Sequence, residues 1–182
     1  MTQQTKILDY VPQPDALTCQ SAAISRVIGS QAVRQVRADL LKIGPPGAPW
    51  TMGEYLRPRV KDYQYDGNAS LDSAIEALKN GYHLITHGWF TSSGHVIGIS
   101  GWDHDSQRFT AEDPWFEFDF PGWTYYPWTY CGDDIPYSAR GIWAACVAGQ
   151  SVWHSHRIYL DTPRLSAAQF AQRGMWLHMV KN

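Results

Sequence analysis

The chain has 182 residues, of which 44% are hydrophobic and 14% aromatic, and its formal net charge is -2 at pH 7. This length and composition predict one domain, residues 1–182, with a core large enough to fold without disulfides or a structural metal. The small net charge disfavours nucleic-acid binding, which normally uses a basic surface.

The three cysteines, Cys19, Cys131 and Cys146, lie far apart, and no pair has the Cys-x-x-Cys spacing of a zinc module. We therefore expect at least one free thiol, no metal and no cofactor. The sequence contains neither a signal peptide nor an apolar run of about 18 residues, so we expect no membrane span. Synthesis in the cytoplasm follows from that expectation, and the site of action stays open, including export or delivery by a phage to the cell wall.

The first predicted elements surround Cys19. Residues 6–11 are expected to be extended and to end at a proline, and residues 13–15, Gln-Pro-Asp, form a turn. An apolar stripe from residue 18 to residue 28 predicts a helix that Gly29 ends. Cys19 is thus expected at the N-terminus of a helix.

Further helices and then strands follow along the chain. The spacing of apolar residues predicts helices at 31–43, 51–56 and 71–79, the last capped by Ser70. Residues 82–90, 95–102 and 108–113 have the composition of strands, with turn residues between them. An aromatic, proline-rich loop is expected at 114–136, an unassigned element at 141–148, a strand at 153–160 and a final helix at 165–179. The order, with helices first and strands later, indicates an α+β protein.

Cys19 is the candidate nucleophile. A thiol attacks only as the thiolate, and the free N–H groups at a helix N-terminus stabilise that anion. Gln13, in the turn before the helix, could supply an amide donor beside the Cys19 backbone N–H, as the oxyanion of acyl transfer requires. Each residue also has a structural interpretation, Cys19 as a small buried hydrophobic residue and Gln13 as a surface side chain.

His95 and Asp113 complete the candidate set. His95 begins a predicted strand after a glycine, which places a base on a rigid element. Asp113 ends the next strand, one hairpin away, and can accept from the second imidazole nitrogen. It is preferred over Glu112, because neighbouring strand residues face opposite sides of a sheet. The alternative for Asp113 is a turn residue before Pro114.

In this order the Gln-x5-Cys element, the Gly-His strand and the Asp-Pro pair resemble the C39-like branch of the papain-like cysteine peptidases, over about residues 7–115. The resemblance implies a papain-like fold with N-terminal helices packed on an antiparallel sheet. It also implies Cys19 as nucleophile, His95 as base and acid, Asp113 as its orienting partner, and Gln13 as oxyanion donor. Many members have Gly-Pro after the nucleophile, whereas this chain has Gln20-Ser21.

The function so implied is amide hydrolysis through a thioester, by a bacterial or phage enzyme with a peptide or peptidoglycan substrate. Trp89, Trp102 and Trp115 are candidate substrate-binding residues, and Trp50 and the segment from Trp123 to Trp128 are further candidate walls. Two alternatives remain. One is an acyltransferase of transglutaminase-like type with the same triad, and the other is a non-catalytic protein that binds a partner through the aromatic loop.

The remaining candidate patterns of histidines, aspartates and cysteines are weaker. His83 and His87 have the spacing of metal ligands on a helix, but they lie in a predicted strand, where residues four apart are distant. Asp103-His104-Asp105 and Asp133-Asp134 have the composition of solvated turns, and Cys131 and Cys146 are expected to be structural.

Overall fold

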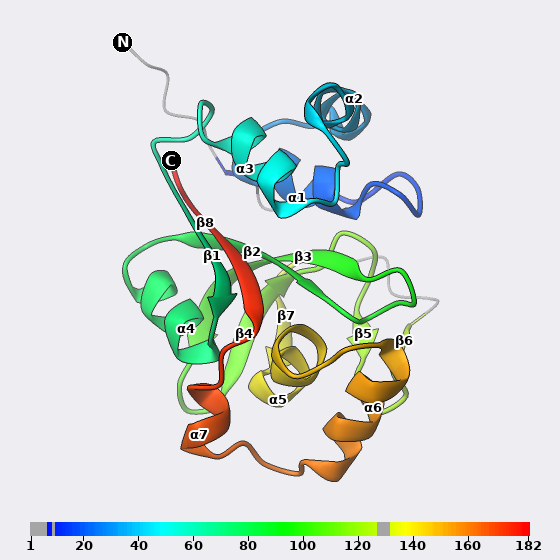
Figure 1. Ribbon diagram of the computed structural model, residues 1–182, viewed down its shortest axis with the longest axis vertical. Coiled ribbons are helices and arrows are strands. Elements are labelled where there is room, and N and C mark those ends of the chain that lie inside the picture. The colour runs from blue at the N-terminus through cyan, green and yellow to red at the C-terminus, as the bar shows by residue number, and fades with distance from the viewer. Residues whose placement is uncertain (1–6, 9, 127–131) are drawn as a thin grey trace.

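The computed structural model describes residues 7–8, 10–126 and 132–182. Its helices and strands form a mixed α+β fold (Figure 1). The helices are α1 (Cys19–Val27), α2 (Val33–Ile43), α3 (Pro49–Leu56), α4 (Leu71–Lys79), α5 (Ala139–Ile142), α6 (Val152–Asp161) and α7 (Ala167–Phe170), with a π-helical turn at Trp143–Val147. The strands are β1 (Asp62–Ala69), β2 (His83–Gly88), β3 (His95–Asp103), β4 (Arg108–Glu112), β5 (Phe118–Asp119), β6 (Thr124–Tyr125), β7 (Ile135–Ser138) and β8 (Met175–Lys181).

A six-stranded antiparallel sheet divides the molecule into two layers. Its strand order is β1-β8-β2-β3-β4-β7, and β5 and β6 form a separate hairpin. Helices α1 to α3 lie on one side of the sheet, above it in Figure 1, and α4 to α7 lie on the other. Two hydrophobic clusters match these layers. The first cluster contains residues of α1, α2 and α3 together with Ile85, Val96 and Val180 of the sheet. The second contains residues of the opposite sheet face together with residues of α4, α5 and α6.

The predicted helices and strands before residue 114 correspond to α1 to α4 and β2 to β4. The N-cap prediction for α4 is confirmed, because the Ser70 hydroxyl accepts from the backbone N–H of Ser73 in a capping box. The sequence interpretation missed β1, whose Asp62–Ala69 segment is polar and lies at the sheet edge, where one side of the strand needs no partner.

Two predictions for the C-terminal third are wrong. The expected strand at 153–160 is helix α6, which Ser151 caps and which buries Ser155 and Tyr159, four residues apart on one helical face. The expected helix at 165–179 is only the short α7 followed by β8. Residues of β8 alternate between the two layers, with Leu177 in one cluster and Val180 in the other.

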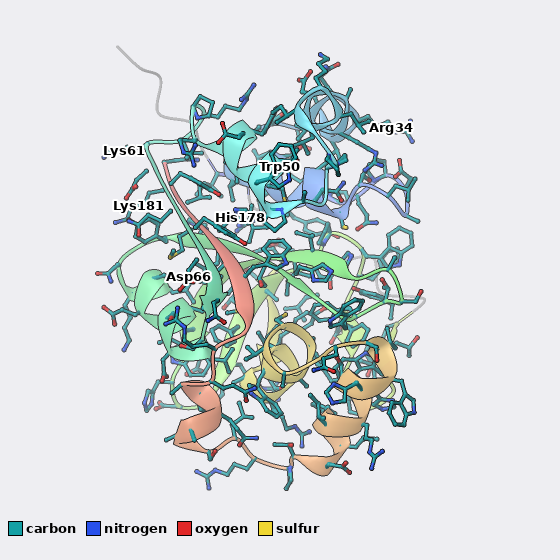
Figure 2. All side chains as sticks on the ribbon, in the orientation of Figure 1. Arg34, Trp50, Lys61, Asp66, His178 and Lys181 are labelled. Atoms are coloured by element: carbon teal, nitrogen blue, oxygen red, sulfur yellow. The ribbon has the colours of Figure 1, made fainter. Side chains whose placement is uncertain are left out.

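Strand β8 inserts between β1 and β2 and carries the buried His178 (Figure 2). Its Nδ1 lies 2.7 Å from the hydroxyl of Tyr63, and burial lowers the pKa of His178 to about 3. A neutral imidazole of this kind belongs to the packing of the sheet against α3. None of the helices in the described part of the chain is long and apolar enough to cross a membrane.

Candidate active site

Cys19 is the first residue of α1 and is half-buried. The turn before it is held by Asp15, whose carbonyl accepts from the Thr18 hydroxyl at 3.2 Å and whose carboxylate accepts from the Leu17 backbone N–H at 3.1 Å. The Cys19 thiol donates to the Gln20 side-chain oxygen at 3.3 Å. The helix therefore presents the sulfur at the end where its backbone N–H groups have no partner within the helix.

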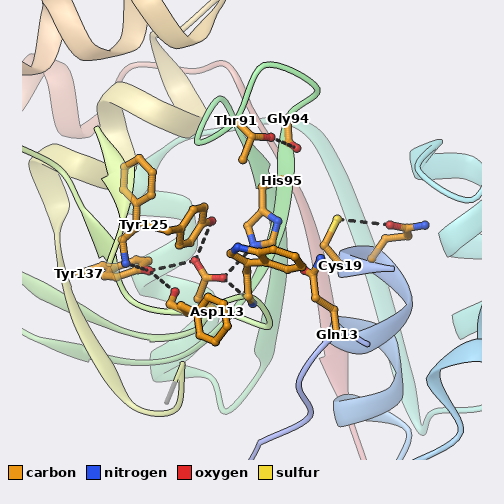
Figure 3. Close-up of polar contacts among 12 residues, drawn as sticks. Gln13, Cys19, Thr91, Gly94, His95, Asp113, Tyr125 and Tyr137 are labelled. Atoms are coloured by element: carbon orange, nitrogen blue, oxygen red, sulfur yellow. Dashed lines mark hydrogen bonds and ion pairs between the residues drawn. The ribbon is translucent and has the colours of Figure 1, made fainter. Parts of the chain in front are cut away.

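His95 is the first residue of β3 and is only 4% exposed. The turn that leads into it is closed by two hydrogen bonds, from the Gly94 N–H to the Thr91 carbonyl at 2.9 Å and from the Thr91 hydroxyl to the Gly94 carbonyl at 2.7 Å (Figure 3). These two bonds fix the turn before β3, and therefore the position of His95 at the start of that strand.

Gly94 is required by its backbone conformation and by its neighbour. Its φ is +77°, and a Cβ atom there would lie 1.9 Å from Nε2 of His87. Gly94→Ala is therefore expected to lower the free energy of unfolding by about 2–4 kcal/mol, as left-handed strain and overpacking add. Chemical denaturation would measure this loss.

Gly47 offers a matched control, because a Cβ atom there would have nothing within 4 Å. Gly47→Ala is expected to change stability by less than about 0.5 kcal/mol. Equal stability of the two variants would contradict the assignment. In Gly94→Ala/His87→Ala the clash is removed and only the backbone strain should remain.

The thiol and the imidazole change each other's acidity. Burial alone would raise the pKa of Cys19, but the hydrogen bond and charge of His95, with the backbone N–H groups of Val96 and Gln20, hold it below the ordinary thiol value. Burial alone would lower the pKa of His95, but the charge and hydrogen bond of Asp113, followed by those of Cys19, raise it. Both shifts favour the same state, a thiolate beside an imidazolium.

Asp113 follows β4 directly and is fully buried. One carboxylate oxygen lies 2.8 Å from Nε2 of His95, which leaves Nδ1 as the ring nitrogen for Cys19. Glu112 faces the other way, where its carboxylate pairs with Arg26 at 3.0 Å. The alternation of strand residues therefore selects between these adjacent acids.

Gln13 is less directly engaged. Figure 3 draws it on the same side of the site as Cys19. Its side-chain amide donates to the Asp15 carbonyl at 2.7 Å, and its backbone N–H donates to the Pro114 carbonyl at 2.8 Å. The second bond ties the turn before Cys19 to the segment after Asp113. The side-chain amide nitrogen carries two hydrogens, and the bond to Asp15 uses one of them, so the other can still be donated to an oxyanion. That role as oxyanion donor stays a prediction.

The three candidate substrate-binding tryptophans lie in different places. Trp115 is next to the site, since its backbone N–H donates to Asp113 at 3.0 Å. The Trp89 ring contacts the edge of His87, whose pKa is lowered to about 4, first by burial and then by the charge of His95. Trp102 is seven residues from His95 along β3, roughly 23 Å, and contacts Phe109 and Phe170.

Of the further candidate walls, Trp123 is only 7% exposed and packs in the core against Phe118 and Phe120. The expectation that it lines a groove is therefore wrong. Trp50 is exposed on α3 (Figure 2). Trp128 and Cys131 lie outside the described residues.

Tyr125 and Tyr137 are site residues that sequence reasoning missed. Their hydroxyls donate to the second oxygen of Asp113 at 3.2 and 2.9 Å. Tyr125 lies 12 residues after Asp113 in the segment expected to be a loop, and Tyr137 lies 24 residues after it, just beyond that segment. No local pattern connects a tyrosine to a distant carboxylate.

Among the described residues, one acidic group could hold a metal ion. Oxygens of Glu112, Asp133 and Asp134 lie within 4.8 Å of one another. Burial, followed by the neighbouring Asp133 carboxyl, raises the pKa of Glu112 to about 8, and Arg26 already pairs with this glutamate. A proton and a guanidinium thus balance the group, and we assign no metal to it.

Cys146 differs from Cys19 in every respect that matters for reactivity. It is buried among hydrophobic residues of the second cluster, and that burial raises its pKa far more than the hydrogen bond with Thr86 lowers it. Such a thiol stays protonated and unreactive.

A comparison with known protein families matches residues 7–133 to the Peptidase_C39 like family. The chain belongs to this family. The matched region contains Gln13, Cys19, His95 and Asp113, and it ends before β7. Membership indicates a cysteine peptidase-type hydrolase. No curated protein sequence shows significant similarity to the chain.

Proposed function

We propose that the chain hydrolyses amide bonds through a triad of Cys19, His95 and Asp113. The observation that carries the proposal is the placement of His95, which lies 2.8 Å from Asp113 at the start of a strand in contact with the helix that Cys19 begins. The helix N-terminus, the lowered pKa of Cys19 and the raised pKa of His95 all favour an activated thiolate.

Acylation would begin with attack of the Cys19 thiolate on the amide carbonyl carbon. The sulfur–carbon bond forms as the carbonyl electron pair moves to oxygen, which Gln13 and the Cys19 backbone N–H would stabilise. The His95 imidazolium then donates its proton to the leaving nitrogen as the carbon–nitrogen bond breaks. An amine departs and a thioester remains on Cys19.

Deacylation would use the same groups in reverse. Neutral His95 takes a proton from water, the hydroxide oxygen attacks the thioester, and the thiolate leaves with the proton held on His95. Asp113 accepts from Nε2 in every state, so Nδ1 always faces the sulfur. The site returns to the ion pair that began the cycle.

A papain-like arrangement is part of the proposal. Its support is a nucleophile at the start of a helix that packs against the strand bearing the base, with α1 and β3 in direct contact. Residues 1–182 are proposed to form one such domain. The substrate is proposed to be a peptide or the peptide part of peptidoglycan, cut by a bacterial or phage enzyme that acts at the cell wall.

The aromatic segment argues against a purely binding role. Phe118, Phe120 and Trp123 pack inward and are at most 7% exposed, whereas Tyr126 is 42% exposed. A binding surface would need such rings at the surface. The three buried rings therefore offer no platform for a partner.

Hydrolysis can be tested by incubating the protein with casein peptides, and separately with purified peptidoglycan, in water enriched in oxygen-18. We expect heavy oxygen in new carboxyl groups with the wild type, measured by mass spectrometry. Cys19→Ala should lower that rate at least about a thousandfold.

Cys146→Ala is the matched control and should leave the rate unchanged. Persistent hydrolysis by Cys19→Ala would refute the proposed nucleophile. A parallel reaction with added methylamine separates hydrolysis from transfer, since a transferase would form the methylamide in place of the labelled acid.

A further inference from the structure

The Asp113 carboxylate receives four hydrogen bonds. One oxygen accepts from Nε2 of His95 at 2.8 Å and from the Trp115 backbone N–H at 3.0 Å. The other accepts from the hydroxyls of Tyr137 at 2.9 Å and Tyr125 at 3.2 Å (Figure 3). The residue is 0% exposed, so the carboxylate is shielded from bulk solvent and depends on these protein donors.

The two tyrosines are themselves held in place. The Tyr137 hydroxyl accepts from the Phe118 backbone N–H at 2.9 Å, so its lone pair is engaged and its hydrogen is directed to Asp113. The Tyr125 ring makes T-shaped contacts with the rings of His95 and Phe118, with centroid distances of 5.7 and 4.9 Å. Burial, followed by the charge of Asp113, raises the pKa of both tyrosines well above the ordinary value. Both therefore remain donors.

We propose that Tyr125 and Tyr137 are positioning residues that hold the Asp113 carboxylate in one orientation toward His95, and that the reactivity of Cys19 depends on them. The proposal rests on the proposed function, because it assigns a purpose to the partner of His95. It also gives a role to the described part of the aromatic segment, because Tyr125 lies there and contacts Asp113.

The physical reason lies in the second carboxylate oxygen. Without the two hydroxyls it would be buried with no donor, and a buried, unsatisfied oxygen is costly, so the carboxylate would turn to find another partner. A turned Asp113 would no longer accept from Nε2 of His95. The proton of the neutral imidazole could then sit on Nδ1, which could no longer accept a proton from Cys19.

The groups that surround the carboxylate define what else could respond to pH. They come from every neighbouring element of the described structure: Cys19 of α1, His95 of β3, Glu112 of β4, Tyr125 of β6, Tyr137 of β7, and Glu117, whose charge acts on Tyr137. Tyr10 donates to the backbone carbonyl of Asp113 at 3.3 Å. Glu112 faces Arg26 on the other side of β4.

The test compares the wild type with Tyr125→Phe, Tyr137→Phe and the double variant. Two readouts are taken from the alkylation of Cys19 by iodoacetamide, located by mass spectrometry: the pH at the midpoint of the rate profile, and the rate near about pH 6. In the double variant the midpoint should rise by about one unit, and alkylation near about pH 6 should therefore be about tenfold slower. Tyr137→Phe should move both values more than Tyr125→Phe, because its bond is shorter.

Tyr159→Phe is the matched control. Tyr159 belongs to the same cluster, 5.8 Å from Phe120 and 5.9 Å from Trp123, but it makes no contact with Asp113 in the described structure. It should leave both readouts unchanged. If the double variant does not fold, Tyr125→Phe alone decides, since it keeps the bond between Phe118 and Tyr137.

An unmoved midpoint of the alkylation profile in the folded variants would overturn the proposal, even if alkylation slowed at every pH, because a loss of packing alone would not change the acidity of Cys19. That result is distinct from failure of the proposed function, which would show as an unreactive Cys19 in the wild type.

Discussion

His95→Ala is expected to slow the alkylation of Cys19 by iodoacetamide about a hundredfold at about pH 6.5. In the wild type the imidazolium holds the pKa of Cys19 below its ordinary value. Without it, burial is the largest remaining influence and raises that pKa, so only about 1% of the thiol would be ionised at this pH. The rate across pH, with the modified peptide identified by mass, measures the effect.

The sign of the pH dependence is specific. A lowered thiol pKa means that wild-type Cys19 stays reactive as pH falls below about 7, whereas the variant regains reactivity only above about pH 8.5. His104→Ala is the control, because this side chain is 90% exposed. Cys146 provides an internal reference and should remain unlabelled. Equal profiles for the wild type and His95→Ala would refute the thiolate–imidazolium pair.

Arg26→Met is expected to lower the free energy of unfolding by about 3–5 kcal/mol at about pH 9, where Glu112 is ionised. Arg26 and Glu112 form an ion pair at 3.0 Å with side chains only 7% and 3% exposed, and Ser100 donates to the same Glu112 oxygen at 3.0 Å. At that pH, removal of the guanidinium leaves the buried Glu112 carboxylate without its charged partner. Denaturant titration at several pH values would measure the loss.

The loss should be smaller at about pH 5 than at about pH 9. Burial and the neighbouring Asp133 raise the pKa of Glu112 to about 8, so below that value a proton neutralises the carboxyl. A group whose pKa is raised on folding contributes stability at low pH and loses it as pH rises through that value. In Arg26→Met/Glu112→Gln part of the stability should return, because no buried charge is left on residue 112. A double variant as unstable as Arg26→Met, or a loss independent of pH, would contradict this account.

Local signals were sufficient for the elements that carry the candidate triad. The prolines before Cys19 end the extended segment, and the apolar stripe after it specifies α1. Gly94 marks the turn that precedes His95, and the alternation of strand residues places Asp113, not Glu112, toward it. The structure places Asp113 2.8 Å from His95, while the catalytic roles of the triad and of Gln13 stay predictions.

Local signals failed where distant segments decide the structure. The segment that forms β8 is mostly apolar without a clear alternation, and it is a strand because β1 and β2 supply hydrogen-bonding partners on both sides. The aromatic and β-branched residues of α6 are typical of strands, yet packing against the second cluster favours the helix. In both segments tertiary contacts outweigh the local preference for helix or strand.

The sequence by itself determined the α+β class, the family and the order of the candidate site residues, because these depend on short-range spacing and on residue chemistry. The tertiary structure alone decided which residues surround Asp113, since Tyr125 and Tyr137 reach it from strands that pair only in the folded chain. It also separated the candidate tryptophans, with Trp115 beside Asp113 and Trp102 far along β3. Hydrogen bonds to a buried carboxylate depend on positions in space, and such positions exist only after the sheet has formed.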